Sequence, residues 1–347
     1  MYVTTIPDVA MTFHANFTRG ANYLSENSQM FSISEPSENL LRVAISDASW
    51  FMNQLTLADV SEERGNTINL GDNTLHTGRT IATRFHKNIN FEGMPYVLEE
   101  TDTCAAISFE QMSMIANSGS GDDEHFTKVM SDLFSKAVSL DMIRVGFNGE
   151  FCGYPTKPDV YKRGQDVNKG WHAIAAEFNE GSQIVTDKIV LGKDGAFPNL
   201  DAMANYLIMK KIPEEYREDP RLVVLVGAEL AGLYREKLFA ASDKPADIQA
   251  SQMALSTVAG RFAIIPPFMP GRRLVVTTLD NLHIYTQKHT RRFRAEFVDD
   301  RKVYEHSYLR NEGYGLGDGR LYAAIDENAI QIEEGVFSLW VKGLNLN

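Results

Sequence analysis

Residues 58–110 contain few apolar side chains, and this long stretch restricts the folds that are open to the chain. Within it, Thr67–Leu70 and Arg79–Phe85 are β-branched or alternating in character, and Gly71-Asp72-Asn73 between them is typical of a turn. Such a segment cannot bury a core of its own, so we expect an extended hairpin or a long loop. Loops of this length are uncommon in compact domains and tend to be functional. In a subunit that reaches over a neighbour, such a loop is expected.

Apolar stripes predict helices on either side of this stretch. The clearer one lies at 122–148, where Asp122 or Asp123 can cap the free amides and apolar residues recur at steps of three and four. Its stripe contains Phe126, Val129, Met130, Leu133, Phe134, Ala137, Val138 and Ile143. At about 1.5 Å a residue, this helix would be a rod of roughly 38 Å. Leu40–Leu57 has the same spacing and predicts a second helix, whereas residues 1–42 show no sustained period.

The remainder of the chain has an α/β texture that gives way to strands. Leu222–Gly227 is a continuous apolar run, typical of a strand that is buried on both faces. Further helices are expected at 171–178, 197–208, 228–239 and 245–258. After Gly260 we expect the strands Arg261–Ile265, Leu274–Leu279, Leu282–Gln287, Thr290–Phe297, Val303–Leu309 and Leu321–Ile325.

The charge balance is acidic, with 46 acidic against 34 basic residues and a formal charge of −12. Tight binding to nucleic acid needs a basic face, because the affinity comes from counterion release. The balance therefore argues against gripping DNA directly, although it does not argue against enclosing DNA. No run of about 18 apolar residues predicts a membrane span, and the N-terminus lacks the basic start and apolar core of a secretory signal. We therefore expect a cytosolic product.

Motifs for chemistry are few. The eight histidines form neither H-x-x-x-H nor H-E-x-x-H, so a metal site would need assembly over long range. The sequence contains neither a G-x-S-x-G elbow nor a phosphate-binding P-loop. Cys104 and Cys152 lie outside metal-type spacing and are expected to be buried, inert thiols. We therefore expect no catalytic residues, no metal and no cofactor.

Two glycine-rich or basic runs have a structural and a functional interpretation. Gly313–Gly319 has a glycine at every second position, but a strand and not a helix is expected after it, which favours a flexible turn over a phosphate loop. His289–Arg294 is the one dense basic patch. Its arginines would either contact phosphates, with Phe293 stacking, or lie on an exposed strand and pair with acidic neighbours in the same or an adjacent subunit. The acidic balance favours the second interpretation.

Several blocks of the sequence resemble the major capsid proteins of P2-like tailed phages. They are, in order, Phe31–Ser37, Arg144–Gly149, Asp166–Trp171, Gly195–Ala202, Asp219–Gly227, Leu279–Tyr285, His289–Arg292 and Val303–Glu305. Each block alone is weak, but their order and spacing make the match specific. Residues 1–30 and the tail from about Gly335 resemble the family poorly.

The resemblance implies the HK97-type capsid fold, an α+β fold with an N-terminal arm, an extended β-loop, a peripheral domain with a long spine helix, and an axial α/β domain. The divisions expected on this sequence are an N-terminal segment at 1–31, an arm at 32–57, the β-loop at 58–110, the peripheral domain at 111–195, the axial domain at 196–300, and strands returning to the peripheral domain with the C-terminal tail at 301–347. No catalytic activity is implied.

The resemblance also implies an assembly and its partners. Subunits of this family form hexamers and pentamers of an icosahedral head around double-stranded DNA, with a portal protein and a scaffolding protease as partners, in the host cytoplasm. The family's leading segment is cut away during assembly. We therefore expect cleavage close to Phe31, with the mature subunit starting near Ser32. The alternative is that residues 1–30 stay attached as an ordinary arm.

Two other functions stay open at this point. One is an encapsulin, a bacterial shell of the same fold that stores a cargo enzyme, against which the P2-like blocks argue. The other, of a different class, is a small-molecule enzyme that uses the α/β region near Gly227. Such an enzyme is expected to run as a small oligomer, whereas both kinds of shell are large.

Overall fold

The structure is a computed structural model, and the chain in it divides into two compact units. It describes residues 7–20, 30, 32, 35–68, 75–81, 83–88, 92–118, 123–192, 194–240 and 256–332. The first unit contains Met1–Arg64, Val97–Ile143 and Ile284–Gly313, and the second contains Gly65–Tyr96, Arg144–His283 and Tyr314–Asn347. Within the described ranges, no helix is both long and apolar enough to span a membrane.

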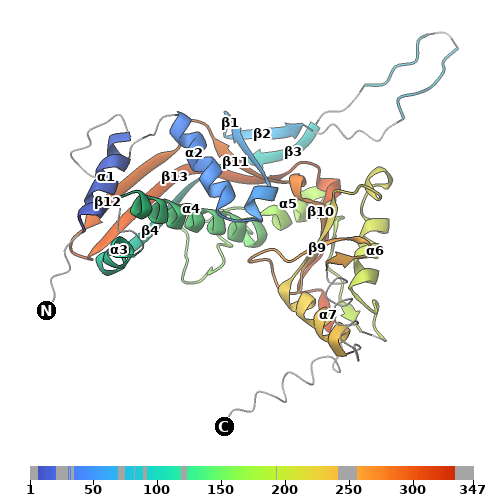
Figure 1. The fold of residues 1–347 in the computed structure, drawn as a ribbon. Coiled ribbons are helices and arrows are strands. Elements are labelled where there is room, and N and C mark those ends of the chain that lie inside the picture. The colour runs from blue at the N-terminus through green and yellow to red at the C-terminus, as the bar shows by residue number, and fades with distance from the viewer. Residues whose placement is uncertain are drawn as a thin grey trace. The chain divides into compact units, whose positions relative to one another are not determined.

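A five-stranded sheet lies mainly in the first unit (Figure 1). Its strands are β1 (Thr56–Val60), β4 (Glu99–Ser108), β11 (Leu282–Gln287), β12 (Arg292–Val298) and β13 (Val303–Leu316). The order is β1-β11-β13-β12, and β4 also pairs with β13. Both β12 and β4 run antiparallel to β13, so that Val303 lies opposite Val298 on one side and Ser108 on the other. The last three of these strands were expected from the sequence, although β13 runs on to Leu316.

Helices pack on this sheet through one apolar cluster. The helices of this unit are α1 (Asp8–Gly20), α2 (Glu35–Asp47), α3 (Phe109–Ala116) and α4 (Asp123–Asn148). The cluster joins α1, α3 and α4 to β12 and β13, and consists of Ala10, Phe13, Phe109, Met112, Phe126, Met130, Phe134, Ala295 and Tyr304. A capping box starts α3, because Ser108 Oγ accepts from Gln111 N at 3.2 Å and Gln111 Oε1 accepts from Ser108 N at 3.0 Å.

The long helix expected at 122–148 is confirmed as α4, but one residue of its stripe is exposed. Phe134 is 6% exposed, whereas the neighbouring Leu133 is 43% exposed. Leu133 lines a hollow together with Ala105 of β4 and Met114 of α3. The stripe is therefore narrower than the spacing indicated, since Leu133 lies at its edge and not on its centre line.

Two expectations for the N-terminal part are corrected. The helix α1 was not predicted, because it is short and only Ala10 and Phe13 of its described side chains are fully buried. Leu40–Leu57, expected as one helix, divides into α2, a 3-10 turn at Met52–Gln54 and β1. Asn53 Nδ2 donates to Asp47 Oδ1 at 3.3 Å at the point where α2 ends. Such side-chain bonds compete with continuation of the helix. The helix therefore ends at this point, although the apolar spacing in the sequence continues.

Within the segment expected as the β-loop, 58–110, a small two-stranded sheet is formed by β2 (Arg64–Ile68) and β3 (Glu92–Val97). Met94 N donates to Thr67 Oγ1 at 2.8 Å across this pair. The described residues at 75–81 and 83–88 have no regular secondary structure, which agrees with the expected long loop and not with a hairpin strand at Arg79–Phe85. β-Branched residues favour strands only where a partner strand or a core supports them.

The second unit is built on a six-stranded sheet with the order β5-β14-β10-β7-β9-β8. The strands are β5 (Ile184–Val185), β7 (Leu222–Val226), β8 (Thr257–Val258), β9 (Arg261–Ile264), β10 (Leu274–Thr278) and β14 (Ala323–Ile325). All five residues of β7 are buried, which confirms the prediction of a strand covered on both faces. The strands β7 and β9 are parallel, and the pair of β7 with β10 is antiparallel.

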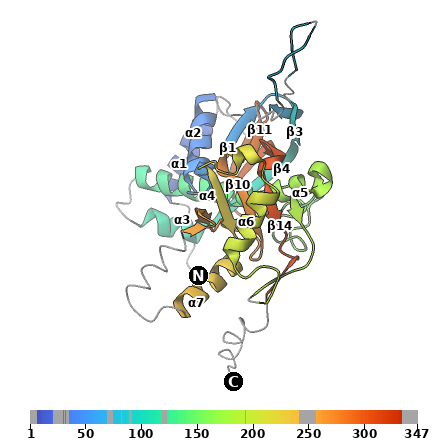
Figure 2. The same ribbon diagram turned by 90° about the vertical axis from the view of Figure 1, so that its right-hand side faces the viewer.

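Helices and small elements complete this unit. They are α5 (Trp171–Glu177), α6 (Leu200–Lys210), α7 (Ala228–Ala240), the pair β6 (Ile189–Leu191) and β15 (Ile330–Ile332), and 3-10 turns at Phe178–Gly181, Glu214–Tyr216, Leu279–Asn281 and Gly319–Leu321. Figure 2 shows α6 beside β10 and β14. The helix expected at 245–258 falls mostly outside the described residues, and its described end is the strand β8.

Candidate functional site

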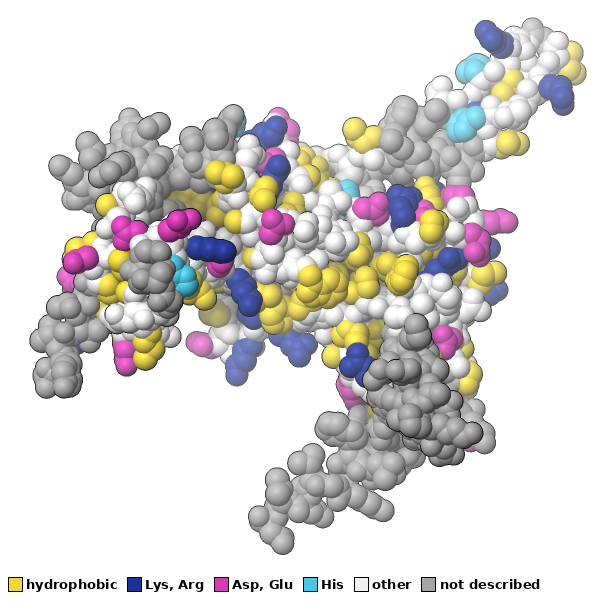
Figure 3. All heavy atoms as spheres, in the orientation of Figure 1, with side chains coloured by type: hydrophobic (Ala, Val, Ile, Leu, Met, Phe, Trp, Pro, Cys, Tyr) yellow, Lys and Arg dark blue, Asp and Glu magenta, His cyan; other side chains and the backbone are white. Residues whose placement is uncertain are grey.

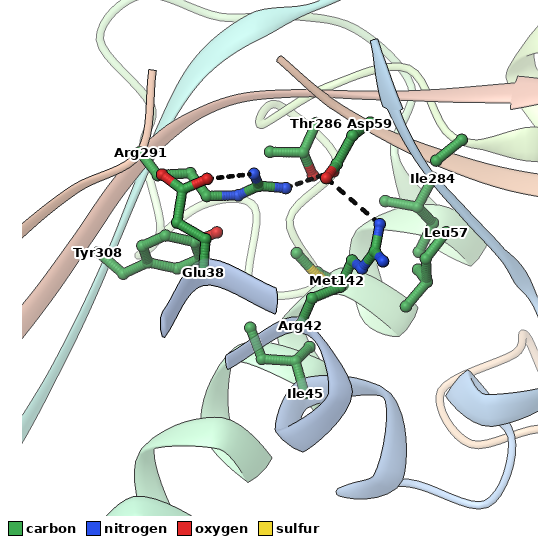
Figure 4. A pocket seen from close by; sticks show the side chains of 11 residues that line it. Glu38, Arg42, Ile45, Leu57, Asp59, Met142, Ile284, Thr286, Arg291 and Tyr308 are labelled. Carbon is green, nitrogen blue, oxygen red and sulfur yellow. Dashed lines mark hydrogen bonds and ion pairs between the residues drawn. The ribbon is translucent and has the colours of Figure 1, made fainter. Parts of the chain in front are cut away.

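The basic run His289–Arg294 leads from a turn after β11 into β12. His289 has a φ of 64°, in the left-handed region that reverses the chain at this turn. The side chain of Arg291 is 5% exposed, and its Nη1 donates to Glu38 Oε2 of α2 at 3.1 Å. Its Nη2 donates to Asp59 Oδ1 of β1. Figure 4 shows the guanidinium between these two carboxylates.

A second arginine joins this group. Arg42 Nη1 lies 3.3 Å from Asp59 Oδ2, so the Asp59 carboxylate bridges two cations. We call Glu38, Arg42, Asp59 and Arg291 the Arg291 cluster. The hollow around it is also lined by apolar side chains, among them Ile45, Leu57, Met142 and Ile284. These neighbours limit water at the ion pairs, which strengthens the attractions and makes an unpaired member costly.

The remaining arginines of the run also meet partners within the chain. Arg292 is exposed and donates to Ser32 Oγ, and Arg294 Nη2 lies 2.6 Å from Glu296 Oε1. The predicted pairing with acidic neighbours in the same subunit is therefore confirmed for Arg291 and Arg294. The predicted exposure is wrong for Arg291, because the turn at His289 directs its side chain toward α2.

A buried ion pair on β13 was missed by the sequence analysis. Arg310 Nε donates to Glu312 Oε2 at 2.6 Å, and both side chains are almost fully buried. Arg310 Nη1 also donates to Thr103 Oγ1 of β4 at 3.0 Å, and the guanidinium carbon lies 4.6 Å from the centre of the Tyr308 ring. The Glu312 carboxylate neutralises the buried charge of Arg310, and the cation–π contact with Tyr308 stabilises the guanidinium further. The spacing of two residues, which places both side chains on one face of a strand, is the sequence signal for this pair.

In the second unit, His172, Asp326 and Glu327 bring their ligand-type atoms within 4.8 Å of one another. His172 Nε2 lies 3.2 Å from Asp326 Oδ2, and the hydrogen bond from His172 holds the pKa of Asp326 down to about 2. Arg273 binds Glu327 through Nε at 2.7 Å and Nη2 at 2.8 Å, and donates Nη1 to Phe147 O at 2.6 Å. Because Arg273 occupies both oxygens of Glu327, the group is an ionic link between the end of α4 and the loop after β14.

Two smaller sequence expectations are corrected. Gly313 and Gly315 lie within β13 and not in a flexible turn, and a Cβ on Gly313 would meet Val97 O at 2.4 Å. Gly313 therefore permits the close approach of the backbone at Val97. Cys104 and Cys152 are exposed, not buried, because Cys104 alternates outward on β4 and Cys152 lies in the loop after α4.

The loop between β2 and β3 carries a distinct surface. Every described side chain at 75–81 and 83–88 is exposed, including Leu75 and Ile81. The segment contains no acidic residue but has Arg79, Arg84, Lys87, His76 and His86. In Figure 3 it shows dark blue, cyan and yellow side chains. In a chain of formal charge −12, a cationic and apolar surface suits contact with an acidic surface.

Comparisons with known proteins agree on one kind of protein. A model of the phage major capsid protein, P2 family, matches residues 12–328. The capsid proteins of Escherichia phage P2 are 24% identical over 281 residues, which cover 74% of this chain and 76% of that protein. The major capsid protein of Serratia phage KSP20 is 21% identical over 276 residues, with coverage of 74% and 77%. A chain from the satellite phage P4 procapsid including size determination (Sid) protein matches with a TM-score of 0.73 and 22% identity, over 95% of this chain and 99% of that one.

The architecture is that of a viral shell subunit with the HK97-type capsid fold, as the resemblance implied. Because the family model covers most of the sequence, the chain belongs to the P2 family of phage major capsid proteins. Its role as a structural component of a phage head follows from this membership.

Proposed function

We propose that the chain assembles as hexamers and pentamers into an icosahedral head that encloses double-stranded DNA. The observation that carries this proposal is the loop between β2 and β3. Its described side chains are exposed. The apolar ones gain free energy when an interface covers them, and the cationic ones can pair with an acidic surface. We infer that this loop lies over a neighbouring subunit, whose acidic surface would complement it.

The charge distribution supports enclosure of DNA without tight, direct binding to it. The densest basic run has two of its three arginines in ion pairs with carboxylates of the same chain. Cations neutralised in this way release few counterions from a phosphate backbone. A wall of formal charge −12 therefore confines DNA without holding it in place.

The division into domains is part of the proposal. The arm at 32–57, the β-loop at 58–110, the peripheral domain at 111–195 and the axial domain at 196–300 keep the bounds expected from the sequence. Residues 301–347 would provide the returning strands and the tail. The long helix α4 supports the spine of the peripheral domain, and the buried strand β7 supports the core of the axial domain.

We also propose that assembly takes place in the host cytoplasm with a portal protein and a scaffolding protease. The protease would cut close to Phe31, so that the mature subunit starts near Ser32. Phe31 lies outside the described residues, while Ser32 is described and exposed. The intact mass of subunits from mature particles tests this step. A mass that matches the full-length chain would contradict cleavage and leave the family assignment standing.

Native mass spectrometry of the purified full-length protein tests the proposed capsomers. Masses at five and six times that of the subunit, together with much larger shells, are the expected result. A single small oligomer, such as a dimer or tetramer at all concentrations, would contradict the proposal. Particles that contain a bacterial enzyme and no DNA would favour a cargo compartment.

A further inference from the structure

An apolar hollow on the second unit is lined by four elements. Its lining comes from the last residues of β6 and β15, the start of α6 and the middle of α7. Its apolar walls are Leu191, Leu200, Leu230, Leu233 and Ile332. Leu233 and Ile332 are only half-buried, so the described residues leave the hollow partly open to solvent.

Two polar residues line this hollow, and each makes a hydrogen bond within the chain. Tyr234, which also lines the hollow, donates its hydroxyl to Asp201 Oδ2 at 3.1 Å, and Asn199 Oδ1 accepts from Ala202 N at 2.9 Å. The other side chains that line the hollow are aliphatic. A hollow of this kind selects apolar side chains and offers no recognition for a charged or sugar-like ligand.

The chain itself continues from the wall of this hollow. Ile332 is both a wall residue and the last described residue, and the sequence after it reads Glu-Glu-Gly-Val-Phe-Ser-Leu-Trp-Val-Lys-Gly-Leu-Asn-Leu-Asn. The run Val336–Val341 contains five apolar residues, including Phe337 and Trp340. The match to the capsid family ends at residue 328, so this run lies outside the part that the family model covers.

We propose that Val336–Val341 packs into this hollow in its own copy of the chain and closes the core of the second unit. Val336 is four residues beyond Ile332, a span of at most about 14 Å for an extended chain, so the run is within reach. Because the tail is tethered at the edge of the hollow, its local concentration exceeds that of any tail from another copy. The inference goes beyond shell assembly, since it assigns an anchoring role to the tail.

Tryptophan quenching of a nearby fluorophore tests the proposal on the full-length protein. Cys104 and Cys152 are replaced by Ser, and Leu233→Cys is labelled with bimane, whose emission is quenched by a tryptophan in contact with it. Arg235→Cys, on the exposed side of α7, is the matched control. Each labelled protein is compared with its Trp340→Phe version, which removes the quencher and leaves Trp50 and Trp171 in place.

The proposal expects strong quenching at position 233 that is lost with Trp340→Phe, and no effect of Trp340→Phe at position 235. Equal emission from both versions at position 233 would overturn it. Mixing labelled Trp340→Phe protein with unlabelled Trp340 protein must not restore the quenching. Restoration on mixing would assign the hollow to the tail of a neighbouring copy and overturn the same-copy proposal.

A second measurement avoids the label, which could itself fill the hollow. Hydrogen exchange of the unlabelled chain is expected to show protected amides in Val336–Val341. Leu233→Asp is expected to abolish that protection, whereas Arg235→Asp retains it. Exchange in this run as fast as that of an unstructured peptide in the parent protein would overturn the proposal independently of the fluorescence.

Discussion

Arg291 is buried between two carboxylates, and this environment decides what its charge can do. An exposed guanidinium would be available to phosphate, whereas this one holds α2 and β1 to the turn before β12. Such a cluster adds modest net stability, because desolvation offsets much of the attraction. Removing one charged member of the cluster costs far more free energy than the whole cluster contributes, because its partner is then buried and unpaired. The residue therefore acts as a structural link of the first unit.

Replacing Arg291 by Met is expected to destabilise the protomer by about 3 kcal/mol, because Glu38 and Asp59 would be left without their buried partner. Arg292→Met, at an exposed position, is expected to change the free energy of unfolding by about 0.5 kcal/mol or less. Urea unfolding of both variants measures the difference. Equal stability of the two variants would contradict the assignment of Arg291 as a buried link.

His306 makes the stability of the first unit depend on pH. It is 8% exposed, stacks on Phe134 with ring centres 4.4 Å apart, and burial lowers its pKa to about 4. Because the pKa is lowered in the folded state, the stability that neutral His306 contributes is complete above the ordinary pKa of 6.5. This stability is lost as the pH falls toward 4. The loss across this window is about 3 kcal/mol, since each tenfold difference in proton affinity between the unfolded and folded states corresponds to about 1.4 kcal/mol.

The variant His306→Phe is therefore expected to lose less stability than the parent between pH 7 and pH 4. The variant His86→Phe, at an exposed position of the loop between β2 and β3, provides the control and is expected to change the free energy of unfolding by about 0.5 kcal/mol or less. Urea unfolding at several pH values gives the two profiles. Parallel profiles for the parent and His306→Phe would show that the ring is not held neutral by burial.

Among the elements, α4 and the loop between β2 and β3 differ most clearly in burial. One face of α4 is covered by α1, α3 and β13 in a shared apolar cluster. The described residues of the loop have no regular structure and are exposed throughout. Burial makes the helix a determinant of protomer stability, whereas exposure makes the loop available to another molecule.

Substitutions at two adjacent residues of α4 test the difference between a buried and an exposed position. Phe134→Asp is expected to destabilise the protomer by several kcal/mol and give insoluble protein, because it places an unpaired carboxylate in the core. Leu133→Asp is expected to leave the protomer soluble, since that side chain is 43% exposed. Soluble yield and urea unfolding measure both. A soluble Phe134→Asp protein of parental stability would mean that the described register of α4 is wrong.

Replacing residues 75–88 by a short Gly-Ser linker is expected to abolish shells and to leave a soluble, folded protomer. The replaced residues contribute no described regular structure, so the protomer should unfold at the urea concentration of the parent. Substituting Leu75, Ile81 and Phe85 by Ser keeps the loop length and removes its apolar groups. Electron microscopy and circular dichroism measure assembly and folding. Closed shells from the shortened chain would exclude the loop as an assembly element.

Across the whole molecule, the sequence predicted those elements whose own residues determine their structure. The continuous apolar run of β7 and the helical period of α4 are strong sequence signals because each element buries most of its apolar residues. The contacts of Arg291 with Glu38 and Asp59 were not predictable in detail, since they join positions more than 200 residues apart. The short helix α1 depends on tertiary contacts of Ala10 and Phe13 with the core cluster, which its own sequence does not reveal.

We propose that this chain builds a closed shell from pentamers and hexamers of itself. Electron microscopy of the purified full-length protein under assembly conditions tests it most directly. We expect closed particles whose surface shows fivefold and sixfold capsomers. Discrete small oligomers that never form curved assemblies, at any protein concentration or ionic strength, would contradict it.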